Sequence, residues 1–132
     1  MQAKILFIDN AADSWYLLST ILKAHDFQPI WAADGMQAIA TARLHQPQAI
    51  FLDLGMPGGD GFLVLERLKS NRLLSHIPVI VVTARDRQIA EEETRRLGAV
   101  AYLQKPIQAD ALTASLRTVL HSDEPAEGGA AN

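Results

Sequence analysis

Side chains that could bind a cation or an anion follow several apolar runs of the chain. They are Asp9 and Asn10 after the first run, Asp53 after the third, Thr83 after the fourth and Lys105 just beyond the fifth. Because the chain has no cysteine, and no histidine near these positions, the available ligands are oxygens, which suit Mg²⁺ better than zinc. A cation held by carboxylates beside a hydroxyl and an ammonium would form a pocket for an anion.

The apolar runs that precede these residues are interpreted as five strands. Most of the runs are continuous rather than alternating, which is typical of strands that are covered on both faces and favours a parallel sheet. The runs cover Ile5–Ile8, Pro29–Ala33, Ala49–Leu52, Val79–Val82 and Val100–Leu103.

Segments of helical length lie between and after these strands, and they cover 13–25, 35–46, 61–74, 87–97 and 108–121. Asp34 and Asp60 precede the second and third segments as candidate caps, and Gly98 ends the fourth. Alternating strands and helices predict right-handed crossovers and an α/β fold, a doubly wound three-layer sandwich. The carboxyl ends of parallel strands meet at one edge, about 4.8 Å from strand to strand, so the polar residues can converge there.

Composition limits the classes of protein that the chain can belong to. Its 132 residues, 48% apolar and 20% charged, predict one globular domain over residues 1–121. Residues 122–132 have little to bury and are expected to be a disordered tail or linker. A net charge of −3 without a basic cluster argues against direct nucleic-acid binding. The lack of cysteine and of long apolar runs favours a cytoplasmic protein without membrane contact.

Three segments resemble the receiver domains of response regulators, the CheY-like superfamily of two-component signalling. They are 53–61 (DLGMPGGDG), Thr83-Ala84 at the end of a strand, and 102–106 (YLQKP), and the resemblance covers roughly residues 3–121. It implies a flavodoxin-like sheet of five strands in the order 2-1-3-4-5 with five helices. It also implies a cis peptide between Lys105 and Pro106.

The resemblance implies a phosphorelay function rather than an enzyme with an external substrate. Asp53 would accept a phosphoryl group from a histidine kinase or a phosphotransfer protein, and the domain would assist its own phosphorylation and dephosphorylation. Thr83 and Lys105 would support the transferred group electrostatically. The implied Mg²⁺ ligands are Asp9, Asn10, Asp53 and the backbone carbonyl of Gly55.

A switch of the outer surface is implied as well, with Thr83 and Tyr102 as its residues. Partners would bind the face made by the fourth helix, the fifth strand and the fifth helix, which could serve an output domain, a downstream protein or a homodimer. The fourth helical segment has few apolar residues and carries the i,i+4 pairs Glu91/Arg95 and Glu92/Arg96, so it should shift at low cost.

The sequence departs from the family at Asn10, where receiver domains usually have a second acidic residue. An amide oxygen can still bind a hard cation, but the site loses one negative charge, so weaker Mg²⁺ binding is expected. Two interpretations stay open: phosphorylation with a higher Mg²⁺ requirement, or a degenerate receiver that acts as a phosphorylation-independent interaction module. Asn10 as a helix cap is compatible with both. Gly55 and Arg85 occupy positions that tune the lifetime of the phosphoryl group in the family.

The sequence disfavours two other classes of α/β protein. A phosphatase of the haloacid dehalogenase type would need an Asp two residues after Asp9, where this chain has Ala11. A dinucleotide or flavin binder would need a phosphate-binding loop after the first strand, where Asp9 would repel phosphate. Trp15 and Trp31 are interpreted as packing or surface residues without a cofactor role.

Overall fold

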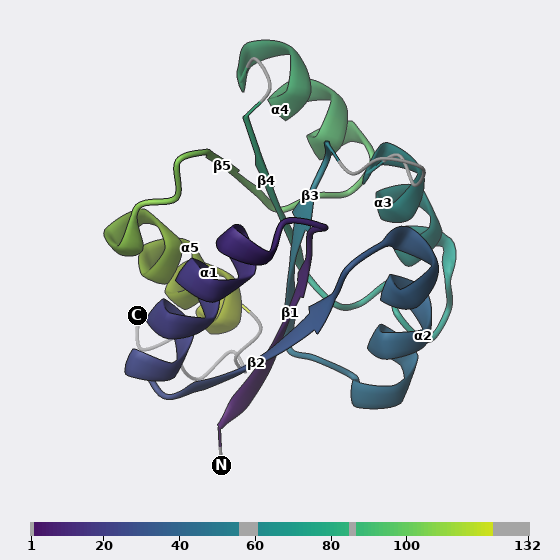
Figure 1. Cartoon of the computed structure of the whole chain (residues 1–132). Helices are drawn as coiled ribbons and strands as arrows, with labels where there is room; N and C mark the ends of the chain where they lie inside the picture. The colour runs from purple at the N-terminus through teal and green to yellow at the C-terminus, as the bar shows by residue number, and fades with distance from the viewer. Residues whose placement is uncertain (1, 56–60, 85–86, 123–132) are drawn as a thin grey trace, which may run out of the picture.

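The computed structural model describes residues 2–55, 61–84 and 87–122, with only the backbone at 87–90 and 121–122. Strands and helices alternate along the described chain (Figure 1). The elements are β1 (Ala3–Ile8), α1 (Ala12–Ala24), β2 (Phe27–Ala32), α2 (Gly35–His45), β3 (Ala49–Asp53), α3 (Gly61–Ser70), β4 (Val79–Thr83), α4 (Arg87–Arg96), β5 (Ala101–Gln104) and α5 (Ala109–Ser122).

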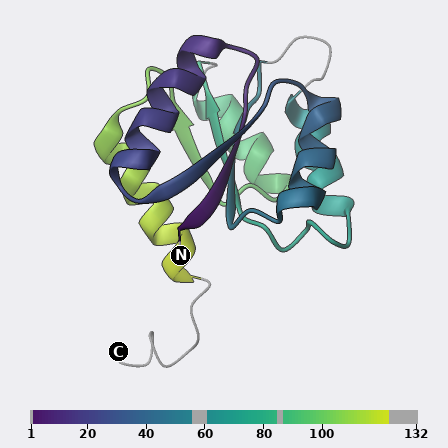
Figure 2. The same ribbon diagram turned by 60° about the horizontal axis from the view of Figure 1, so that its bottom comes forward.

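The five strands form one parallel sheet in the order β2-β1-β3-β4-β5, which confirms the predicted α/β fold and its strand order. Helices α1 and α5 cover one face of the sheet, and α2, α3 and α4 lie on the other (Figures 1 and 2). Among the described residues, no helix has the length and apolarity needed to cross a membrane.

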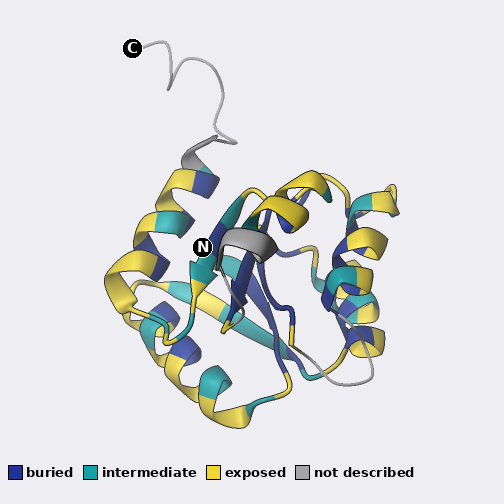
Figure 3. Ribbon diagram, turned by 90° about the horizontal axis from the view of Figure 1, so that it is seen from above, coloured by how far each residue is buried: buried dark blue, intermediate teal, exposed yellow. Residues whose placement is uncertain are grey.

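Two apolar clusters, one on each face of the sheet, make up the core. Alternate residues of β1 enter different clusters: Leu6 and Ile8 pack with α2 and α3 residues, whereas Ile5 and Phe7 pack with α1 and α5 residues. The central strands are buried and the outer sides of the helices are exposed (Figure 3). Burial on both faces explains why the strand sequences are continuously apolar.

Several predicted boundaries differ from the structure by one or two residues, and one differs by more. The prediction extended the third helix to residue 74, but α3 ends at Ser70. Asn71 interrupts it, because its Oδ1 accepts from the Leu73 N–H at 2.9 Å and its carbonyl accepts from Leu74 and Ser75. Such local hydrogen bonds compete with helix continuation.

The predicted helix signals are confirmed where the structure describes them. Asp34 is the N-cap of α2, and its side chain accepts from the Gln37 N–H at 2.8 Å. Gly98 follows α4 with φ +110°, a conformation that favours glycine. Ser122 still belongs to α5, one residue past the predicted boundary. The predicted cap Asp60, the tuning residue Arg85 and the tail 123–132 lie outside the described residues.

Candidate functional site

The predicted site residues lie at the carboxyl edge of the sheet. Asp9 directly follows β1, Asp53 ends β3 and Thr83 ends β4. Lys105 follows β5, and its backbone N–H donates to the Thr83 carbonyl at 2.9 Å. The Lys105–Pro106 peptide is cis, as the family resemblance implies.

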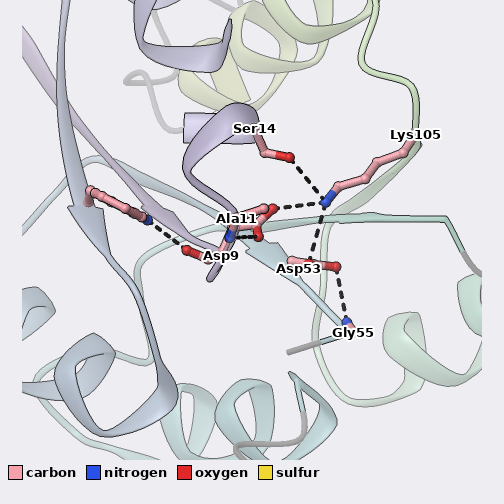
Figure 4. Close-up of polar contacts among 7 residues, drawn as sticks. Asp9, Ala11, Ser14, Asp53, Gly55 and Lys105 are labelled. Atoms are coloured by element: carbon pink, nitrogen blue, oxygen red, sulfur yellow. Dashed lines mark hydrogen bonds and ion pairs between the residues drawn. The ribbon is translucent and has the colours of Figure 1, made fainter. Parts of the chain in front are cut away.

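The Lys105 ammonium joins the two carboxylates of the site. Its Nζ lies 2.9 Å from Oδ2 of Asp9 and 3.4 Å from Oδ2 of Asp53. It also donates to the Ser14 hydroxyl, at 3.5 Å. Figure 4 shows the lysine reaching from the loop after β5 to all three side chains. The ammonium thus reduces the repulsion between two acidic groups that the sheet brings together.

Backbone groups hold the Asp53 side chain from the loop that follows β3. Its Oδ1 accepts from the Gly55 N–H at 3.0 Å. The adjoining α3 begins against this strand at Gly61, where a Cβ atom would lie 2.4 Å from Cα of Leu54 and 2.7 Å from the Asp53 carbonyl oxygen. Only glycine fits this close approach, which places the start of α3 beside the acidic residue.

Asp9 is fully buried, and hydrogen bonds hold it at both its backbone and its side chain. Oδ1 accepts from the Ala11 N–H at 2.8 Å, while Oδ2 accepts from Lys105. The backbone N–H donates to the Ala32 carbonyl at 3.2 Å. The backbone carbonyl accepts from the Trp31 indole Nε1–H at 2.6 Å. This carboxylate therefore has a defined place relative to Asp53.

These surroundings raise the pKa of both Asp53 and Lys105 above their usual values. For Asp53, burial is the largest cause and the charge of Asp9 adds to it, although the Gly55 N–H and Lys105 act in the opposite direction. For Lys105, burial would lower the pKa, but the hydrogen bond to Asp9 and the charges of both carboxylates outweigh it. The lysine therefore stays protonated beside a carboxylate whose charge is only partly compensated.

The remaining predicted residues have surroundings that differ from one another. Thr83 is buried, one residue beyond Val82, which pairs with Asp53. Tyr102 is buried too and belongs to the cluster on the side of α2 and α3. Asn10 is exposed, and it is not the helix cap that the sequence left open. The N-cap of α1 is Ala11, which makes no side-chain capping bond.

The donor chemistry of the site fits a hard divalent cation. Asp9 and Asp53 offer carboxylate oxygens that both lie beside the Lys105 ammonium, and such oxygens are the ligands that Mg²⁺ prefers. In the described part of the chain, no group of three or more His, Cys, Asp or Glu side chains could hold a metal ion. The site thus brings two carboxylates together, and the exposed Asn10 follows one of them in the chain.

Two contacts at the site were not predicted from the sequence. Ser14 of α1 accepts from Lys105, and Trp31 of β2 donates to Asp9 although 22 residues separate them. Trp31 also stacks on Trp15, with ring centroids 5.5 Å apart and planes 7° apart. The interpretation of the tryptophans as packing residues holds for this stack, but it missed the bond to Asp9.

Comparison with known proteins identifies relatives over most of the chain. The family model described as response regulator receiver domain matches residues 5–117. Protein PilH of Pseudomonas aeruginosa is 34% identical over 118 residues, which cover 89% of this chain and 98% of PilH. Response regulator PleD of Caulobacter vibrioides is 37% identical over 119 residues, which are 90% of this chain and 26% of PleD.

A solved structure agrees with these sequence matches. The chemotaxis protein CheY4 of Vibrio cholerae superposes with a TM-score of 0.85 at 26% identity, over 91% of this chain and 100% of CheY4. A flavodoxin-like sheet with two acids and a lysine at its carboxyl edge defines a class of small signalling domains. This chain belongs to the response regulator receiver domain family of two-component systems. Receiver domains generally bind Mg²⁺ and interact with histidine kinases and output domains.

Proposed function

We propose that Asp53 accepts a phosphoryl group from a phosphohistidine of a histidine kinase or phosphotransfer protein in the cytoplasm. An Asp53 carboxylate oxygen would bond to phosphorus while the bond from phosphorus to the histidine nitrogen breaks, and the electron pair of that bond would return to the imidazole. The contact of Lys105 with both Asp53 and Asp9, at 3.4 and 2.9 Å, is the observation that carries the proposal.

The residues around Asp53 would share the work of phosphoryl transfer. Lys105, which already bridges the carboxylates, would turn to the oxygens of the incoming group, and the Thr83 hydroxyl would donate to them. The proposed ligands of Mg²⁺ are Asp9, Asn10, Asp53 and the Gly55 backbone carbonyl. When bound, Mg²⁺ would neutralise the negative charge that gathers as the phosphoryl group and the carboxylates approach one another.

The output would be a change of the face formed by α4, β5 and α5. Thr83 and Tyr102 are the proposed switch residues, and phosphorylation would favour the buried position that the Tyr102 ring occupies in the structure. The partner at this face would be an output domain, a downstream protein or a second copy of the chain. The exposed Val100, between α4 and β5, adds apolar surface for such a contact.

Asn10 favours a second candidate function, a degenerate receiver that binds partners without phosphorylation. The observation behind it is the count of carboxylates: two converge, and Lys105 already compensates part of their charge. A site with one carboxylate fewer attracts a divalent cation less strongly. We favour phosphorylation, because the acceptor, the hydroxyl and the lysine are all present.

The test is labelling with a small acyl-phosphate donor and Mg²⁺, followed by intact mass measurement. The wild type should gain one phosphoryl group, and Asp53→Asn should gain none. Asp34→Asn is the matched control, because the Asp34 side chain caps α2 and Asn can keep that cap, and it should be labelled like the wild type. Equal labelling of Asp53→Asn would overturn the assignment of the acceptor.

A further inference from the structure

The backbone of Asp9 is bound by two consecutive residues of β2, Trp31 and Ala32. The ladder of β1 and β2 ends with Ile8 opposite Ala32, and the Asp9 N–H still donates to the Ala32 carbonyl at 3.2 Å. The chain then turns toward α1, and the Asp9 carbonyl lies beyond the end of the ladder. The Trp31 indole takes the place of a strand partner, because its Nε1–H donates to the Asp9 carbonyl at 2.6 Å.

This indole bond completes the hydrogen bonding of Asp9. The N–H, the carbonyl, Oδ1 and Oδ2 of this buried residue each have a partner. A carbonyl oxygen held in place fixes the plane of the peptide that links Asp9 to Asn10. The direction in which both side chains leave the backbone therefore depends on the Trp31 contact.

The Trp31 indole also packs against α1. Trp31 stacks on Trp15 with centroids 5.5 Å apart and planes 7° apart, and both rings are half-buried. Trp15 lies in the first turn of α1, where its backbone N–H donates to the Ala11 carbonyl at 3.1 Å. The Trp31 indole thus holds the loop 9–11 by a hydrogen bond and packs against α1 through a stacked ring.

We propose that Trp31 is a positioning residue, which holds the Asp9–Asn10 peptide so that the Asp9 carboxylate stays beside Asp53 and Lys105. The part of this inference that concerns Mg²⁺ rests on the proposed function. With an amide at position 10, Asp9 carries a larger share of cation binding, so its placement matters more. Trp31 acts on the site only through Asp9 and touches neither phosphoryl group nor cation.

The geometric part can be tested without metal by amide hydrogen exchange. The Ala11 N–H, which donates to Asp9 Oδ1 at 2.8 Å, reports whether this carboxylate is in place. In Trp31→Phe, which keeps a ring but loses the N–H, Ala11 should exchange roughly three- to tenfold faster, the range that one neutral hydrogen bond accounts for. The Phe51 amide in the core should be unaffected.

Trp15→Phe is the matched control, because it removes an indole of the same stack and leaves the Trp31 N–H in place. Its Ala11 exchange should stay within about twofold of the wild type, since Phe at position 15 keeps a ring against the Trp31 indole. An unchanged Ala11 rate in Trp31→Phe would overturn the inference. So would equal acceleration of Ala11 and Phe51, which would indicate a general loss of stability.

Mg²⁺ binding, measured by calorimetry, tests the functional part. Trp31→Phe should bind Mg²⁺ about three- to tenfold more weakly, and Trp15→Phe should bind it within about twofold of the wild type. Equal affinity in Trp31→Phe and wild type would contradict the functional part. A wild type that binds no Mg²⁺ would count against the proposed function instead, and the metal-free Ala11 rates would still decide whether Trp31 positions Asp9.

Discussion

Helices α1 and α4 both follow a strand that leads to the site, yet they are attached to the sheet in different ways. Helix α1 buries Leu18, Ser19 and Leu22, and its first turn stacks Trp15 on β2. The described side chains of α4, residues 91–96, are mostly exposed, with Thr94 buried. Ion pairs run along that exposed surface, with Glu91 and Arg95 at 2.9 Å and Glu92 and Arg96 at 3.7 Å.

This difference distinguishes α1, which lies beside the acidic residues, from α4, which is less firmly packed on the sheet. A buried apolar side makes the α1 region costly to displace, whereas exposed ion pairs contribute little to stability. Local opening should therefore be easier at α4 than at α1. The proposed division of labour is that α1 and β2 keep Asp9 in place while α4 responds to the state of Asp53.

The largest expected effect on stability comes from truncating a side chain on the buried side of α1. Leu18 is fully buried, so Leu18→Ala should lower the free energy of unfolding by about 2–5 kcal/mol through lost burial and a residual cavity. Urea denaturation measures it. A loss below about 1 kcal/mol would mean that α1 is no more firmly attached than an exposed helix.

Replacing the proposed acceptor Asp53 should have a smaller effect of opposite sign, an increase in stability at neutral pH. Burial raises the pKa of Asp53, so the folded protein binds its proton more tightly than the unfolded chain does. Stability from this group is present at low pH and is lost as the pH rises through the raised pKa. Asp53→Asn removes that loss and should raise Tm at neutral pH by about 1 to 5 °C.

The gain from Asp53→Asn should disappear below the ordinary carboxyl pKa of 3.8, where both states of the wild type are protonated. Thermal unfolding of both proteins across the pH range, without metal, measures this. Finding Asp53→Asn less stable than the wild type at neutral pH would show that Lys105 more than compensates the buried charge.

Restoring an acid at position 10 should change stability in a metal-dependent way. Without metal, Asn10→Asp adds a negative charge near Asp9 and Asp53 and should lower the free energy of unfolding by about 1 kcal/mol or less, since Asn10 is exposed. Added Mg²⁺ should then stabilise the variant more than the wild type. Equal Mg²⁺ stabilisation of the two proteins would contradict the role given to the missing carboxylate.

The smallest effect is expected on α4. Arg95→Ala breaks the 2.9 Å ion pair with Glu91, in which the Arg95 side chain is 69% exposed and the Glu91 side chain 29%. It should lower the free energy of unfolding by at most about 0.5 kcal/mol. Arg96→Ala, which breaks the longer pair with Glu92, is the comparison and should cost less. Urea denaturation at low and high salt measures both. A cost above about 1 kcal/mol for Arg95→Ala would remove the contrast between the two helices.

The sheet and most helix limits could be predicted from the sequence because local patterns determine them. Continuous apolar runs indicate strands covered on two faces, and Asp34 and Gly98 mark helix ends by their own hydrogen bonding and backbone preference. The predicted end of α3 was wrong, since the turn at Asn71 stops the helix although the helical apolar pattern continues. The strand order came from the family resemblance, and the structure confirms it.

The site was predictable in its main residues and not in its supporting contacts. Asp9, Asp53 and Lys105 each end or follow an apolar run, so parallel strands bring them to one edge. The Trp31 bond to Asp9 depends on how an indole leaves the neighbouring strand, and the Ser14 contact depends on the rotation of α1. No spacing in the sequence encodes either contact, because both arise from tertiary packing.

The most direct test of the central claim is the fraction of Asp53 labelled by a small acyl phosphate as a function of Mg²⁺ concentration, in the wild type and Asn10→Asp. If Asp53 is an acceptor at a site that lacks one carboxylate, both proteins reach full labelling, and the wild type needs more Mg²⁺. If the wild type stays unlabelled at every Mg²⁺ concentration while Asn10→Asp is labelled, the claim is contradicted, and the chain is a phosphorylation-independent interaction module.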